Sequence, residues 1–183
     1  MDGARPHAAE AVAEGDAVLA RRAAMGDVDA FTLLATRHER RVRGFLLRLC
    51  GGSVLADDLA QDTFLRAWRK AAAFRGDGDY QGWLLRIAWR CFLSDRRTPR
   101  PDAAPLEGQE LFASPSDPDL GLDLNSALAR LEPRERAVAM LCLVEGYSHG
   151  DAAAILQLPL GTTKSILLRA RAKLAAVLER SDA

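Results

Sequence analysis

Apolar residues recur at steps of three and four along most of this chain, which is the spacing of one face of an α-helix. The clearest stripe lies in residues 29–49, and the Gly51-Gly52 pair after it predicts a helix stop. The members of the stripe are Phe31, Leu34, His38, Val42, Phe45, Leu46 and Leu49. No segment alternates convincingly between apolar and polar residues at period two. The pattern therefore predicts an all-α protein without a sheet.

Turn and capping signals divide the chain into two helical domains. Ser53 can cap a helix that runs to about residue 73. The glycine-rich loop 74–82 follows it, and helix resumes over about 81–97. Residues 99–122 hold five of the eight prolines and show no apolar period, which predicts a flexible linker. Further helices are expected near 123–131, 133–145, 148–156 and 162–180. We predict a loose leader (1–15), a first helical domain (16–98), the linker (99–122) and a second helical domain (123–183).

Composition and charge narrow the class of protein. The formal net charge of the 183 residues is zero, but residues 99–123 carry six acids against one arginine, and both flanking domains are mildly basic. Because the linker has few apolar residues, it is expected to leave the two apolar cores separate. Three cysteines without a CxxC motif argue against a disulfide framework or a zinc site. No apolar run reaches 18 residues. We expect a soluble, cytoplasmic protein.

Enzymatic chemistry finds no support in the sequence. P-loop, GxSxG and HExxH motifs are absent. His38 lies on the apolar stripe, where a role in the core or at its rim is favoured over catalysis. The pair Asp57-Asp58 lacks a third converging ligand, so neither a metal nor a cofactor is expected.

The segment EGYSHGDAAAILQLPLGTTKSILLRARAKL (145–174) has the layout of a helix-turn-helix. Ser148 and Asp151 have the spacing of a capping box, and Pro159 ends the first helix. On a helical wheel, one side of the second helix is the core side, with Thr163, Leu167, Ala170, Leu174, Val177 and Leu178. The opposite side is small, hydroxylated and basic, with Thr162, Ser165, Arg169 and Lys173. This side suits the DNA major groove, but a solvated bundle helix would show the same periodicity.

LPLGTTKSILLRARAKL (158–174) resembles the final helix-turn-helix of the extracytoplasmic-function (ECF) branch of the sigma-70 family. The resemblance implies that this helix reads the promoter −35 element, and it adds Lys164 and Leu168 to the groove contacts. Two positions depart from the family pattern. Ile166 stands where a basic residue is frequent, and Gln157 stands where a turn glycine is common.

A second, independent match lies in ADDLAQDTFLRAW (56–68), which resembles the ECF segment that grips the clamp helices of core RNA polymerase. On a helical wheel, Ala56, Ala60, Thr63, Phe64, Ala67 and Ala71 form the buried side. The opposite side sets an aromatic and an aliphatic residue among carboxylates, which suits a partner interface. Its members are Asp58, Gln61, Asp62, Leu65 and Trp68. The alternative is that Trp68 folds back onto a neighbouring helix.

FRGDGDYQGWLLRIAWRCFLSDRR (74–97) resembles the ECF segment that opens the promoter and reads its −10 element. Arg86, Arg90 and Arg97 fall on one stripe of a helix, with Trp89 beside it, and can hold phosphates while a pocket receives an unstacked base. The loop 76–82, with Gly78, Asp79 and Tyr80, is the natural place for that pocket. Trp83 is expected in the core, and a core role is the alternative for Trp89.

The sequence therefore predicts a sigma factor: a non-enzymatic protein whose partners are core RNA polymerase, promoter DNA and, by family habit, an anti-sigma factor. Two other classes stay open at this stage. One is a helix-turn-helix regulator that does not act as a polymerase subunit. The other is an all-helical interaction adaptor.

Overall fold

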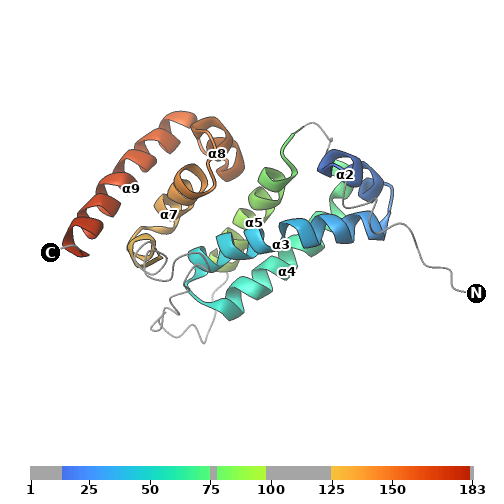
Figure 1. The fold of residues 1–183 in the computed structure, drawn as a ribbon, viewed down its shortest axis with the longest axis horizontal. Helices are drawn as coiled ribbons and strands as arrows, with labels where there is room; N and C mark the ends of the chain where they lie inside the picture. Colours follow the sequence, from blue (N-terminus) through green and yellow to red (C-terminus); the bar gives the residue numbers. More distant parts are fainter. Residues whose placement is uncertain (1–13, 75–77, 98–124, 182–183) are drawn as a thin grey trace, which may run out of the picture.

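The computed structural model describes residues 14–74, 78–97 and 125–181, and its regular elements there are all helical (Figure 1). This confirms the all-α prediction. The predicted linker lies outside the described residues, as do residues 1–13 of the predicted leader.

The first helical group agrees with the sequence pattern to within a few residues. Asp27 caps the start of α3, because its side chain accepts a hydrogen bond from the Ala30 amide at 3.0 Å. Gly51 ends the helix at φ 73°, a conformation that glycine adopts without strain. The elements are α2 (Asp16–Ala24), α3 (Val28–Cys50), α4 (Ser53–Arg69), a 3₁₀ turn (Ala71–Ala73) and α5 (Tyr80–Arg97).

The second group begins with helical residues 125–129 and ends with the helix-turn-helix. The helix predicted over 133–145 is α-helical only in its first half and continues as a π-helical turn. The elements are α7 (Pro133–Ala139), the π turn (Met140–Val144), α8 (His149–Leu156) and α9 (Leu160–Ser181). In Figure 1, α5 lies between this group and the other helices of the first group.

Small side chains dominate the positions where helices approach closely. Ala30, Ala56, Ala67 and Ala88 are fully buried, which explains how a chain poor in aromatic residues packs its core. The buried side chains of the two groups form one continuous cluster. The expectation that the two cores stay separate is therefore wrong for this structure, because α5 and α3 pack directly against the second group.

Arg136 of α7 ties the two groups together. Its guanidinium donates to the carbonyls of Arg48 at 2.8 Å and Leu49 at 3.3 Å, at the C-terminal end of α3. It also donates to the carbonyls of Ala129 at 2.6 Å and Leu131 at 3.1 Å in its own group. A cation is favoured at a helix C-terminus, where carbonyls lack helical partners. Burial lowers the pKa of Arg136.

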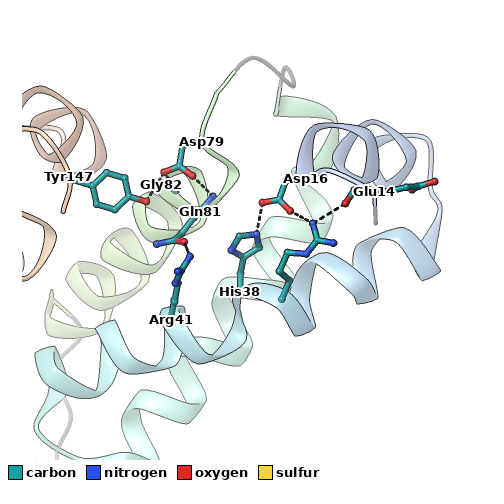
Figure 2. Close-up of polar contacts among 9 residues, drawn as sticks. Glu14, Asp16, His38, Arg41, Asp79, Gln81, Gly82 and Tyr147 are labelled. Carbon is teal, nitrogen blue, oxygen red and sulfur yellow. Dashed lines mark hydrogen bonds and ion pairs between the residues drawn. The ribbon is translucent and has the colours of Figure 1, made fainter. Parts of the chain in front are cut away.

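His38 has a structural role, as its place on the apolar stripe predicts. The ring is buried, and its Nε2 lies 2.8 Å from Asp16 Oδ2 (Figure 2). This contact joins α2 to α3.

Candidate nucleic-acid and partner interfaces

A groove of about 760 Å³ lies between α3 and α4. Three of the five predicted polymerase-binding residues line it: Gln61, Leu65 and Trp68. Leu65 is 47% exposed and faces the groove. Trp68 lies against Phe31 of α3 with ring centroids 5.1 Å apart, so it partly folds back, yet it still forms one end of the groove. The groove is thus lined by the kinds of apolar and aromatic side chains that anchor partners in protein interfaces.

Charged side chains surround the groove. Arg43 of α3 and Asp57 of α4 both line it and form an ion pair with Nε–Oδ1 at 2.5 Å. The guanidinium of Arg43 lowers the pKa of Asp57. Asp58 is exposed, and Asp62 pairs with Arg66 one helical turn away at 3.0 Å. Neither Asp58 nor Asp62 belongs to the groove lining, although Gln61, between them in sequence, does.

The predicted base-contacting residues of α5 fall into an exposed set and a buried set. Arg90 and Arg97 are exposed, and Arg86 is half-buried. Trp89, in contrast, is 2% exposed and stacks on Phe92 with centroids 5.6 Å apart. The prediction that Trp89 lies on the nucleic-acid side is wrong for this structure, because its ring packs into the core.

The loop before α5 is described only from residue 78 onward, so the rest of the predicted base pocket lies outside the described residues. Gly78 and Asp79 are exposed. Asp79 caps α5, because its carboxylate accepts from the amides of Gln81 at 3.0 Å and Gly82 at 2.9 Å. Tyr80 is buried among Phe74, Trp83 and His38, so it does not present its ring to a base here.

The helix-turn-helix forms with the predicted local signals. Ser148 caps α8: its hydroxyl oxygen accepts from the Asp151 amide at 3.1 Å, and its O–H donates to the Asp151 carboxylate at 2.6 Å. Gln157 takes the left-handed conformation at the turn, with φ 56°. The position therefore demands a positive φ, as expected where the family commonly has glycine.

The two sides of α9 separate as the helical wheel predicts. Thr163, Leu167, Ala170 and Leu174 are buried, and Thr163 also donates to the Pro159 carbonyl at 3.2 Å. Ile166 is buried too, so this departure from the family pattern enlarges the core. The exposed positions include all six predicted groove contacts: Thr162, Lys164, Ser165, Leu168, Arg169 and Lys173. Leu168 is 73% exposed, which leaves a bare apolar side chain on the helix.

Lys173 is held by an ion pair within its own domain. Its ammonium donates to both carboxylate oxygens of Glu135 in α7, at 2.9 and 2.7 Å. The hydrogen bonds from Lys173 lower the pKa of Glu135. Glu135 in turn accepts from the Glu132 amide at 3.2 Å and completes the capping box of α7.

Comparison with known families matches these two helical regions separately. Residues 34–100 match Sigma-70 region 2, and residues 122–174 match Sigma-70, region 4. RNA polymerase sigma-H factor of Pseudomonas aeruginosa is 30% identical over 86% of this chain and 91% of its own length. The chain belongs to the ECF branch of the sigma-70 family. The regulator and adaptor classes left open by the sequence are thereby set aside, because both sigma regions are present in the order of the family.

Other sigma factors agree in sequence and in fold. ECF RNA polymerase sigma factor SigE of Mycolicibacterium smegmatis is 35% identical over 77% of this chain, which spans 58% of that relative. Among solved structures, the co-crystal structure of the sigma factor RpoE with the anti-sigma factor NepR from Bartonella quintana matches 83% of this chain and 98% of that chain. The TM-score is 0.73 and the identity 30%.

Sequence reasoning on this sigma factor missed the α3 side of the groove. Phe31 belongs to the predicted core stripe, and no predicted site includes Thr32, Ala35 or Glu39, yet all four line the groove. The available signal is that Phe31 and Ala35 stand one turn apart and continue the apolar stripe to one side. An apolar stripe that is wider than one core face needs indicates a second contact surface on the helix.

Two further findings concern metal binding and membrane spanning. Within residues 14–74, 78–97 and 125–181, no three His, Cys, Asp or Glu side chains gather in a group that could hold a metal ion. In the same residues, no helix is long and apolar enough to cross a membrane.

Proposed function

We propose that this sigma factor carries out promoter recognition with three separate surfaces. The groove between α3 and α4 receives the clamp of core RNA polymerase. The exposed side of α5, with Arg86, Arg90 and Arg97, holds the opened −10 strand. The exposed side of α9 reads the −35 element. Acting on polymerase and DNA, the protein works in the cytoplasm and catalyses no reaction itself.

The observation that carries the proposal is the composition of the α9 surface. Its N-terminal half exposes Thr162, Lys164 and Ser165, and Arg169 follows one turn later. Hydroxyls and a guanidinium are the groups that pair with base edges in the major groove, and no bulky aromatic stands in their way. Leu168, exposed beside them, suits contact with a thymine methyl group.

Promoter-dependent transcription with purified core polymerase tests this proposal. Arg169→Ala should cost about 1–3 kcal/mol in promoter binding if the guanidinium reads a base, and should relax the preference at one −35 position. Arg171→Ala is the matched control, because Arg171 is exposed on α9 outside the predicted groove contacts. The groove assignment fails if Arg169→Ala keeps both activity and −35 preference.

An anti-sigma factor is the further partner we propose. The support is that RpoE of Bartonella quintana, similar over most of this chain, was solved in complex with one. Co-purification of the tagged chain from its own cells, followed by a competition assay with core polymerase, tests this partner. An inhibitor must lower core binding by the sigma factor.

A further inference from the structure

The groove between α3 and α4 has two unlike ends. At one end, Phe31 of α3 lies against Trp68 of α4, with ring centroids 5.1 Å apart. At the other end, Arg43 of α3 pairs with Asp57 of α4. On either helix these two contacts are separated by about three turns. The two helices therefore run antiparallel along the groove, from an aromatic end to an ionic end.

The charges of the groove gather at its ionic end. All lining residues belong to the described part of the chain, and those with charged side chains are Glu39, Arg43 and Asp57. Glu39 stands one turn before Arg43 on α3, so the two side chains are neighbours on one side of that helix. Arg43 thus has a carboxylate of its own helix and a carboxylate of α4 within reach.

In this structure Arg43 is paired with Asp57. Its Nε donates to Asp57 Oδ1 at 2.5 Å and its Nη2 to Asp57 Oδ2 at 3.2 Å, so both carboxylate oxygens are engaged. These hydrogen bonds raise the pKa of Arg43, and the nearby charge of Glu39 raises it further. The side chains of Arg43 and Asp57 are 42% and 50% exposed, so the ion pair can open into water without leaving a buried charge.

We propose that Arg43 sets the specificity of the groove by alternating between two carboxylates. In the free protein it holds Asp57. When the clamp of core polymerase docks, Arg43 turns to Glu39, and Asp57 pairs with a cationic side chain of the clamp. This inference rests on the role of the groove given above. The occupant that fits is a helix of about three turns, with apolar side chains toward Phe31 and Trp68 and a cation toward Asp57.

Charge complementarity is the reason for assigning a cation to this end of the clamp. With Arg43 turned to Glu39, Asp57 is left as the unpaired carboxylate among the lining residues. A partner with an apolar side chain at this place strands that carboxylate in a desolvated interface, and a partner with a carboxylate is repelled. A cation restores the ion pair that docking breaks. Arg43 on Asp57 thus disfavours every partner that cannot replace it.

Substitution of Arg43 separates this role from a structural one. Arg43→Met keeps the apolar stem and removes the competitor for Asp57. Affinity for core polymerase should rise about two- to fivefold, the range expected for release of one exposed ion pair. A purely structural role predicts no gain. The gain should shrink as the salt concentration rises above about 0.1 M, because salt screens exposed charges. Arg43→Lys retains the charge and should bring the affinity back toward the wild-type value.

Two further variants show whether Asp57 carries the effect. In an Asp57→Asn background, Arg43→Met should give no gain, because the carboxylate that it releases is gone. Arg40→Met is the matched control, since Arg40 is an exposed arginine of α3 outside the groove lining. It removes the same charge from the same helix and should leave the affinity unchanged. Titration of labelled protein with purified core polymerase measures each affinity, and far-ultraviolet circular dichroism verifies the helical content.

Several results would overturn the inference. A weaker affinity of Arg43→Met would mean that Arg43 itself contacts the clamp, and an unchanged affinity would mean that Asp57 is not used. A gain that persists in the Asp57→Asn background, or that Arg40→Met matches, would be a general effect of charge.

The role of the groove is judged separately, by Leu65→Asp at its apolar surface. If Leu65→Asp lowers core affinity while Arg43→Met changes nothing, only the inference about Arg43 fails. If Leu65→Asp leaves core affinity intact, the groove is not the docking site, and the inference falls with it.

Discussion

At the scale of the residue, the most consequential contact is the one between Lys173 and Glu135. Lys173 lies on the exposed side of α9, where a phosphate contact is predicted, yet its ammonium is hydrogen-bonded to a nearly buried carboxylate within its own domain. Lys173→Ala should therefore lower the free energy of unfolding, by about 1 kcal/mol, the usual size of a hydrogen bond between charged partners at the edge of a core. Urea unfolding at pH 7 measures this loss.

The acidity of Glu135 gives the same contact a pH signature. Because the pKa of Glu135 is lowered in the folded state, its ionised form stabilises the fold above the pKa of the unfolded state, near 4.3. That contribution is lost as the pH falls through the folded pKa. The difference between wild type and Lys173→Ala should therefore shrink below pH 4. Lys164→Ala, exposed on the same helix, should show no such pH dependence. A deficit of equal size at pH 3 and pH 7 would contradict the assignment.

Residue-level predictions from the sequence succeed where periodicity alone decides exposure. Thr163 and Leu167 are buried and Thr162 and Arg169 exposed, as a helical wheel requires. They fail where another element decides. Trp89 lies next to a basic stripe on the wheel, but the neighbouring helices close over it. Lys173 lies on the exposed side, but α7 brings Glu135 within its reach. A single helix cannot show what packs beside it.

At the scale of the element, α4 joins a core stripe to one wall of the groove proposed to receive core polymerase. Leu65 is the exposed apolar centre of the groove, so Leu65→Asp places a charge there at little cost to the fold. We expect affinity for core polymerase to fall at least tenfold, about 1.4 kcal/mol, as for a hot-spot residue. Titration of labelled protein with core enzyme measures this loss.

Helix α4 also supplies its own control. Val54 is 76% exposed in the first turn of α4 and outside the groove lining, so Val54→Asp adds the same charge away from the proposed interface. Its affinity for core polymerase should stay at the wild-type value. Equal losses in both variants, or an unchanged affinity of Leu65→Asp with its helical content intact, would remove the groove from the interface.

Element boundaries were predictable where a turn or capping residue marked them: Gly51 ends α3 in the left-handed conformation, and the Ser148 side chain caps α8. The predicted cap at Ser53 is one position late, because Gly52 occupies the N-cap position of α4 and Ser53 is the first residue of the helix. The π-helical turn at Met140–Val144 was not predictable, because its sequence MLCLV carries no signal distinct from an ordinary apolar helix. The α3 side of the groove was missed for a related reason: a groove is made by two helices, and only the α4 side carries a pattern of apolar residues among carboxylates that points to a partner.

At the scale of the whole molecule, the arrangement of the two regions was beyond the sequence. Their apolar stripes predict two cores, and the periodicity does not indicate that these cores form one continuous cluster. The join depends on single side chains that reach across, above all Arg136, whose guanidinium serves carbonyls of both groups. In the sequence, Arg136 stands three residues after Pro133, near the start of a predicted helix. An arginine at such a position is ordinarily solvated, so the sequence does not mark it as a link between the two groups.

Arg136 thus allows a prediction about cooperativity. In the wild type, one continuous core should give a single unfolding transition, seen alike by near- and far-ultraviolet circular dichroism. Arg136→Met keeps the apolar stem but leaves four buried or partly buried carbonyls without their donor, at a cost of about 2–4 kcal/mol. Because two of those carbonyls end α3 and two belong to region 4, the loss falls on the junction. The variant should unfold in two steps, with region 4 melting first.

Arg130→Met is the control, because Arg130 is exposed and lies nearby in sequence, and this variant should keep the single transition. A single transition in Arg136→Met, shifted to lower temperature, would mean that apolar packing between the regions suffices to couple them and that Arg136 stabilises each region without joining them.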